Sequence, residues 1–316
     1  MAVCMIFSYI PNAFAASDSI NKASADFYTI KSAEELFEVL GGEDIAELDG
    51  DKVTMDMSAQ LYTGIIISCD EINLDLNGNT ICFNNSDANI MQLRSGVLNI
   101  EDSAKGGSIK YSDSVQSHVL AAIGGTIVLD GGTIAGINAM GGNVEINGGD
   151  ILTDELDGVL NLSYGSSAVM NSGCILGKQT TVNVYTSGDF VINGGTITSL
   201  NGAGISILGG SAKINGGNIT SNSYYGYETF PAVACYTPNL TITGGNITGK
   251  KIALRLYCKL DKTISGGTFK GGEFALKSRY DLESAIKTGF KVVDKNGNKI
   301  DPLGKSVQGK VRVIAE

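Results

Sequence analysis

The sequence predicts an all-β fold, a right-handed parallel β-helix whose coils contain three short strands and about 22 residues each. Two observations lead to this fold class: a nine-residue motif centred on a glycine doublet recurs along the chain, and the composition is repetitive. The 316 residues include 42 glycines, 4 prolines and no tryptophan. The motif occurs seven times, as TIVLDGGTI, NVEINGGDI, SAVMNSGCI, DFVINGGTI, SAKINGGNI, NLTITGGNI and DKTISGGTF.

The spacing of the doublets sets the size of one coil. Successive doublets are separated by 17, 24, 22, 22, 28 and 22 residues. A typical step of about 22 residues suits three strands and three bends, and such coils stack about 4.8 Å apart. A leucine-rich repeat has a similar period, but its L-x-x-L-x-L-x-x-N frame is absent. The doublets begin at Gly131, Gly148, Ser172, Gly194, Gly216, Gly244 and Gly266.

Each position of the motif has a predicted place in the coil. One inward column precedes the doublet and a second follows it, and a third strand ahead of them appears at 182–184, 205–207 and 254–256. Asn147, Asn171, Asn193 and Asn215 are expected to stack as a hydrogen-bonded ladder. The inward columns are Ile146, Ile192, Ile214, Ile242 and Ile264, then Ile134, Ile151, Ile175, Ile197, Ile219, Ile247 and Phe269. An outward polar stripe is expected from Thr133, Asp150, Cys174, Thr196, Asn218, Asn246 and Thr268.

The two ends of the solenoid are predicted to be capped, because unpaired strand edges promote aggregation. Residues 16–50 are assigned to an N-terminal segment with a capping helix at 32–40, where Ser32 is the N-cap and Glu35 follows three residues later. Residues 51–275 are assigned to the β-helix. Residues 276–316 are expected to form a short helix and a hairpin that turns at Asn296 and Gly297.

The first fifteen residues are predicted to be a signal peptide. They form a short apolar stretch that ends in Ala13-Phe14-Ala15, the small-x-small pattern that precedes signal peptidase cleavage. The mature protein is therefore expected to be secreted or displayed at the cell surface, with no transmembrane segment. Its five cysteines are an odd number at irregular spacing, so we expect small core residues instead of a disulfide framework or zinc site.

The net charge of −10 argues against nucleic-acid binding. The charge is unevenly distributed, because residues 1–249 carry 8 basic and 26 acidic side chains, whereas residues 250–316 carry 15 and 7. The basic C-terminal part is expected to attract anionic wall polymers or an acidic partner, and self-association is equally compatible with it.

The segments NLDLNGNTI and LNIEDSAKGGSI and the recurrent INGGTI units resemble those of the pectin lyase-like β-helix proteins of bacteria. The resemblance covers roughly residues 30 to 275. It implies the fold, but it leaves function open, because the superfamily contains polysaccharide lyases, glycoside hydrolases, depolymerases and adhesins without known chemistry.

The motifs expected of such enzymes are missing. A galacturonase-like hydrolase should show Asn-Thr-Asp, Asp-Asp, Gly-His-Gly and Arg-x-Lys segments, and none occurs. The single histidine, His118, is expected to be a surface imidazole. No cofactor is required, but calcium is a candidate ligand of an acidic cluster that otherwise forms a solvated loop. The cluster consists of Asp150, Asp154, Glu155 and Asp157.

Binding of carbohydrate is the functional prediction with the best sequence support. The longest inter-coil step holds Tyr224, Tyr225, Tyr227 and Phe230, and exposed aromatic rings can stack on sugars. The alternative is that these rings shield the flank of the helix. Arg255 lies in mid-strand, should point to solvent and is a further candidate for carbohydrate binding. A second aromatic set, Tyr164, Tyr185, Tyr236 and Tyr257, is expected to have a packing role beside Ile123, Met140 and Leu208.

Together these observations predict a secreted or cell-surface β-helix protein that binds polysaccharide or another surface component without turning it over, as an adhesin does. Two alternatives stay open. In the first alternative, the chain is a polysaccharide lyase or glycoside hydrolase with a non-standard site. In the second, it is a structural spacer of the cell envelope.

Overall fold

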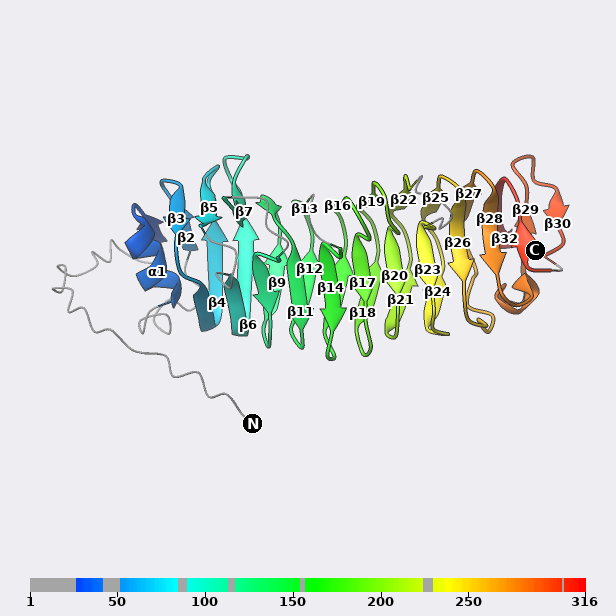
Figure 1. Cartoon of the computed structure of the whole chain (residues 1–316), viewed down its shortest axis with the longest axis horizontal. Coiled ribbons are helices and arrows are strands. Elements are labelled where there is room, and N and C mark those ends of the chain that lie inside the picture. Colours follow the sequence, from blue (N-terminus) through cyan, green and yellow to red (C-terminus); the bar gives the residue numbers. More distant parts are fainter. Residues whose placement is uncertain are drawn as a thin grey trace, which may run out of the picture.

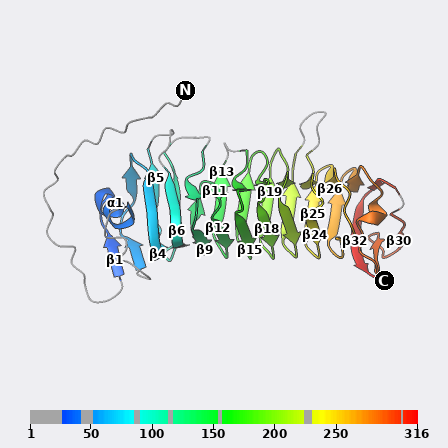
Figure 2. The same ribbon diagram turned by 90° about the horizontal axis from the view of Figure 1, so that it is seen from below.

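The computed structural model describes residues 27–41, 52–84, 90–112, 117–153, 157–223, 230–302 and 304–316. Short parallel strands stack into an elongated rod, with the N-terminal helix at one end and the C-terminus at the other (Figure 1). The predicted parallel β-helix with an N-terminal helix is confirmed. Each regular coil contributes one strand to each of three walls, and Figure 2 shows the same rod from below.

The first wall contains the strands that precede the glycine doublets. Its members are β1 (Phe27–Ile30), β2 (Lys52–Met55), β9 (Thr126–Leu129), β12 (Asn143–Ile146), β15 (Ser167–Met170), β18 (Asp189–Ile192), β21 (Ser211–Ile214) and β24 (Leu240–Ile242). The second wall contains the strands that follow the doublets. Its members are β3 (Ala59–Leu61), β5 (Thr80–Phe83), β7 (Ser108–Tyr111), β10 (Thr133–Ile134), β13 (Asp150–Thr153), β16 (Cys174–Gly177), β19 (Thr196–Ser199), β22 (Asn218–Ser221), β25 (Asn246–Gly249) and β27 (Thr268–Gly271).

The third wall precedes the first in each coil. Its members are β8 (Leu120–Ala122), β11 (Ile137–Met140), β14 (Leu160–Ser163), β17 (Val182–Val184), β20 (Ile205–Ile207), β23 (Val233–Cys235), β26 (Ile252–Leu256) and β28 (Phe274–Ser278). Near the N-terminus, β4 (Ile65–Asp75) and β6 (Met91–Glu101) each run through both the third and the first wall, with a shift of register at Ser68.

The two predicted isoleucine columns form the core. All their members are buried, and Met170 fills the place of an isoleucine in the first column. Parallel pairing keeps the columns in register, since Ile192 pairs with both Met170 and Ile214. Burial of such stacked side chains is the main source of stability of the rod.

The two glycines of each doublet have different physical roles. The second glycine has a positive φ in all seven copies, for example +79° at Gly195. The first glycine does not, and Ser172 therefore replaces it in one copy. At the second position an L-residue is strained, which explains why glycine is invariant there among the seven copies.

The predicted asparagine ladder is confirmed. The side-chain amides of Asn171, Asn193 and Asn215 each donate to the side-chain oxygen of the preceding coil's asparagine at 2.8 Å, starting from Asn147. The hydroxyl of Thr243 extends the ladder by donating to Asn215 at 2.9 Å. The predicted outward stripe is also in register from Thr133 to Thr268, one residue per coil on the second wall.

The N-terminal end is covered by the predicted helix. The helix α1 (Ala33–Gly41) begins with a capping box, in which the backbone N–H of Glu35 donates to the Ser32 hydroxyl at 3.0 Å and the Glu35 carboxylate accepts the N–H of Lys31 at 2.7 Å. Its buried face consists of Leu36, Val39 and Leu40. Among the described residues, no helix is long and apolar enough to cross a membrane.

At the C-terminal end, antiparallel strands terminate the parallel stack. The strand β32 (Lys310–Ala315) pairs with β27, β31 (Ser306–Val307) pairs with β28, and β29 (Phe290–Val293) pairs with β32. The predicted hairpin joins β29 to β30 (Lys299–Ile300), with a positive φ at Gly297. The predicted helix is only a 3₁₀ turn (Leu282–Ser284), because Ile286 continues the first inward column by bridging to Ile264.

Candidate functional site

The structure places two of the predicted sugar-binding residues on neighbouring coils of the third wall. Phe230 precedes β23 and is 37% exposed. Arg255 lies in β26 between the buried Leu254 and Leu256 and points outward, as alternation requires. Tyr224, Tyr225 and Tyr227 lie outside the described residues.

The predicted calcium ligands are only partly described, because Asp154 and Glu155 lie outside the described residues. Asp150 belongs to the outward stripe of the second wall, paired in register with Thr133 and Cys174. Asp157 is exposed ahead of β14, and its carboxylate accepts the N–H of Thr180 at 3.2 Å. The described part of the chain contains no group of three or more histidine, cysteine, aspartate or glutamate side chains that could hold a metal ion.

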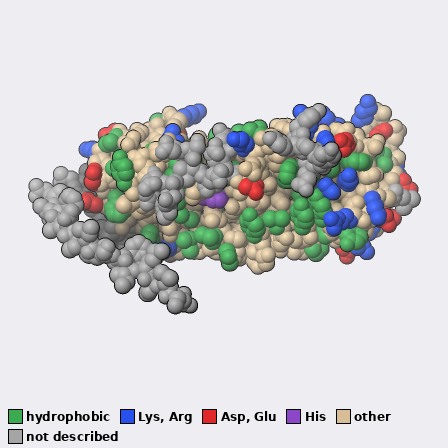
Figure 3. Space-filling view, viewed as in Figure 1, with side chains coloured by type: hydrophobic (Ala, Val, Ile, Leu, Met, Phe, Trp, Pro, Cys, Tyr) green, Lys and Arg blue, Asp and Glu red, His purple; other side chains and the backbone are tan. Residues whose placement is uncertain are grey.

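The most distinctive surface feature is a row of outward residues at the carboxyl ends of the third-wall strands, which we call the aromatic row. Figure 3 shows hydrophobic side chains in a band over this edge of the rod, below the middle of the view. Leu208 is 43% and Tyr236 45% exposed, so the packing expected for these residues leaves part of each side chain at the surface. In register, the row contains Ile123, Met140, Ser163, Tyr185, Leu208, Tyr236 and Tyr257.

One residue expected in the aromatic row lies outside it. Ser163, not Tyr164, occupies the equivalent position, because Met140 pairs with Ser163. Tyr164 is the next residue, has a positive φ of 55° and is 80% exposed. Its ring therefore projects from the turn and does not belong to the flat band of side chains.

The side-chain geometry of the aromatic row is best defined at its C-terminal end. The rings of Tyr236 and Tyr257 stack with their centroids 4.2 Å apart and an interplanar angle of 4°. The guanidinium of Arg255 lies 4.6 Å from the centroid of the Tyr257 ring, and that of Arg279 lies 5.3 Å from it. Burial, followed by the hydrogen bond with Tyr257, raises the pKa of Tyr236 to about 12, and the charges of Arg255 and Arg279 oppose this shift only in part. The phenol of Tyr236 is therefore neutral at neutral pH.

Cations gather beside the stacked rings. Lys277 of β28 pairs in register with Arg255, and Arg279 follows two residues later. Figure 3 shows lysine and arginine side chains concentrated towards this end of the rod. Part of the excess of basic residues in the C-terminal region therefore lies on the same wall as the aromatic row.

A polar cluster lies further along the third wall. His118 is partly buried, and its Nε2 lies 2.7 Å from the carbonyl oxygen of Gly158, to which it donates. Asn183 is 4% exposed and donates to Asn161 at 3.2 Å. Burial lowers the pKa of His118, and the bond to Gly158 opposes this shift only in part. His118 therefore reaches the surface only in part, and its half-buried imidazole is hydrogen-bonded and neutral at neutral pH.

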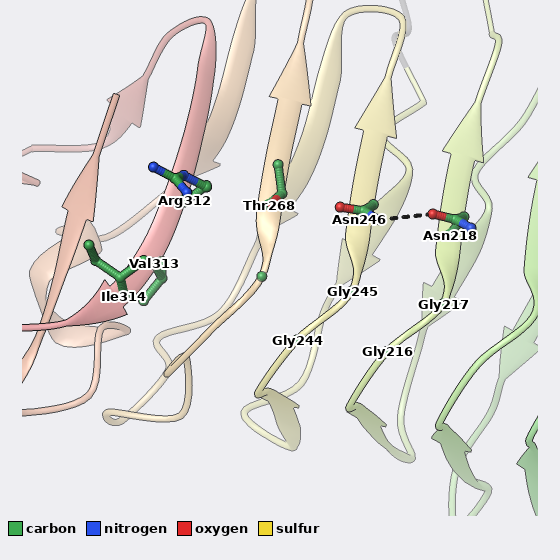
Figure 4. A pocket seen from close by; sticks show the side chains of 11 residues that line it. Gly216, Gly217, Asn218, Gly244, Gly245, Asn246, Thr268, Arg312, Val313 and Ile314 are labelled. Carbon is green, nitrogen blue, oxygen red and sulfur yellow. Dashed lines mark hydrogen bonds between the residues drawn. The ribbon is translucent and has the colours of Figure 1, made fainter. Parts of the chain in front are cut away.

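A concave region lies at the C-terminal end of the second wall. It is a hollow of about 500 Å³ beside the glycine doublets of three coils, where β32 closes the stack (Figure 4). The amide of Asn246 donates to the Asn218 oxygen at 3.0 Å, and Thr268 and Arg312 continue the same stripe in register. Asn218 and Asn246 already bond to each other, and Arg312 is exposed to solvent. The hollow therefore offers fewer polar groups oriented toward a ligand than the third wall does.

The outward position of Arg255 was predicted correctly from the sequence, whereas the exposure of Tyr164, Tyr185 and Tyr236 was not anticipated. The sequence did contain a signal, since Tyr236 and Tyr257 are 21 residues apart, close to one coil. No protein-family model, curated protein or solved structure matches this chain in our comparisons.

Proposed function

We propose that this protein is a secreted or cell-surface member of the pectin lyase-like β-helix group that binds an extended polysaccharide along its third wall, without cleaving it. The observation that carries the proposal is the aromatic row, which ends in the stacked pair Tyr236 and Tyr257. Apolar sugar faces pack against the exposed parts of aromatic rings, and in this pair Tyr236 is 45% exposed while Tyr257 is half-buried.

The repeat of the wall supports an extended ligand. Successive coils present equivalent side chains about 4.8 Å apart, so a polymer lying along the rod meets the same chemistry at each step. Arg255, Lys277 and Arg279 adjoin the rings, which favours a polymer that carries carboxylate, sulfate or phosphate groups. The predicted loop residues Tyr224, Tyr225, Tyr227 and Phe230 come before β23 in the sequence and also belong to the proposal.

The experiment is a polysaccharide array probed with the purified chain, with and without calcium, while each spot is monitored for unsaturated or reducing-end products. Tyr236→Ala and Tyr257→Ala are expected to weaken retention about tenfold each, the effect of losing about 1.4 kcal/mol of binding free energy. Tyr164→Ala is the matched control, because Tyr164 is exposed but lies outside the aromatic row.

Each result has a distinct meaning. Retention that falls in the two row variants and persists in the control supports the third wall as the binding face. Retention that depends only on Tyr224, Tyr225 and Tyr227 moves the site to the loop. Product release overturns the non-catalytic proposal in favour of a lyase or hydrolase, and the absence of both retention and products favours the structural spacer.

A further inference from the structure

Two cysteines that the sequence suggested were separate core residues lie together behind the aromatic row. Cys235 is the last residue of β23 and is fully buried, whereas Cys258 follows β26 and is partly exposed. Both thiols donate to the same backbone oxygen, that of Thr237, at 3.0 Å from Cys235 Sγ and 2.7 Å from Cys258 Sγ. Two sulfurs that contact one oxygen at these distances are at most 5.7 Å apart.

The contact between the two residues is direct. Cys258 Sγ also lies 3.8 Å from the carbonyl oxygen of Cys235, and the thiols are within hydrogen-bonding reach of each other. They belong to adjacent coils, because Cys235 pairs in register with Leu256, two residues before Cys258. A disulfide between them requires the sulfurs to approach from at most 5.7 Å to about 2 Å.

We propose that Cys235 and Cys258 form a disulfide that clamps these two coils together when the chain meets an oxidising disulfide. The partly exposed Cys258 reacts first: its thiolate attacks a small-molecule disulfide, forms a mixed disulfide and releases one thiol. The thiolate of Cys235 then attacks Cys258 Sγ and releases the second thiol. Overall, two cysteine thiols are oxidised and the external disulfide is reduced to two thiols, which take up the two protons.

The position of this clamp gives it a specific structural effect. Cys235 directly precedes Tyr236, and Cys258 directly follows Tyr257. The disulfide would therefore join the two coils that carry the stacked rings and fix their separation. This modification is separate from the proposed polysaccharide binding, since its formation is read from the thiols alone.

The test uses the purified chain, fully reduced, freed of reductant and then incubated in native buffer with glutathione disulfide. After acid quenching, the remaining thiols are alkylated in denaturant, and the intact mass and tryptic peptides are measured. Cleavage after lysine and arginine gives one peptide of residues 214–250 with Cys235 and another of residues 256–259 with Cys258. We expect these two peptides to be joined, with two fewer alkylated cysteines than in the reduced chain.

Three variants make the outcome decisive. Cys235→Ser should leave glutathione attached to Cys258, and Cys258→Ser should give no linked peptide. Cys174→Ser is the control and should retain the linked peptide, because Cys174 lies on the second wall. If Cys235→Ser does not fold, Cys258→Ser alone decides the question, because its side chain is partly exposed. The proposal is wrong if the parent chain keeps glutathione on Cys258, alkylates both residues fully, or links either of them to another cysteine.

Discussion

The buried carboxylate of Asp75 gives the sharpest test of the forces that hold the N-terminal coils together. Asp75 ends β4 and is 2% exposed. It accepts the backbone N–H and hydroxyl of Ser103 at 3.0 and 2.7 Å, and the N–H of Asn77 at 2.9 Å. The ammonium of Lys52 lies 3.0 Å away. A substitution of Asp75 by asparagine removes the charge while keeping the size of the side chain.

The expected magnitude follows from the pKa. Burial alone would raise the pKa of Asp75, but the hydrogen bonds from Ser103, Lys52 and Asn77 outweigh it and lower the pKa from 3.8 to about 2. At about 1.4 kcal/mol per pKa unit, the ionised form stabilises the fold by about 2.5 kcal/mol. Because the folded-state pKa is lowered, this stabilisation is complete above about pH 4 and is lost as the pH falls through 2.

The assay is urea unfolding of the parent chain and of Asp75→Asn at pH 7 and at pH 2. We expect Asp75→Asn to lower the free energy of unfolding by about 2.5 kcal/mol at pH 7 and by much less at pH 2. Asp130→Asn is the matched control, because Asp130 occupies the same position of the coil two coils later but is exposed. An equal cost of Asp75→Asn at both pH values would refute the electrostatic argument.

Three further predictions concern the repeats, each measured by urea unfolding. Gly195→Ala should cost about 2–3 kcal/mol, because at a φ of +79° its Cβ would lie 2.9 Å from the backbone oxygen of Gly173, besides 2.4 Å from the movable end of Met170. Gly165→Ala, at a φ of +83° with open space, should cost only about 1 kcal/mol. Asn193→Ala breaks two exposed ladder bonds and should cost about 1 kcal/mol, so no measurable loss would make the ladder energetically neutral. Oxidation should stabilise the parent chain by about 3 kcal/mol, since the disulfide closes a loop of 23 residues, and should not stabilise Cys258→Ser.

The fold was predictable because the repeat marks both the core and the bends. The isoleucines on either side of each doublet became the two inward columns, and Asn147 to Asn215 became a continuous ladder. The exception at Ser172 also has a physical reason, since only the second position of the doublet has a positive φ. The prediction of a C-terminal helix was wrong because the local pattern of residues 282–290 does not reveal that Ile286 completes a coil.

The candidate site was less predictable because it depends on how coils of unequal length align. Tyr164 and Ser163 differ by one position, which decides whether a ring joins the aromatic row. His118 is covered through a contact with Gly158, 40 residues away, and no local pattern indicates such a contact. Cys235 and Cys258 could have been paired from the sequence, because their separation of 23 residues is close to one coil.

The strands of neighbouring coils stay in register even where one coil is longer than the others, and this makes the rod tolerant of inserted residues. The step from Gly216 to Gly244 is 28 residues, yet β20, β21 and β22 pair with β23, β24 and β25 without a shift. In the sequence, the additional residues fall between the end of β22 at Ser221 and the start of β23 at Val233. This junction is therefore a natural graft point, where a foreign peptide can be displayed at a fixed place on a stiff scaffold while the hydrophobic interior stays the same.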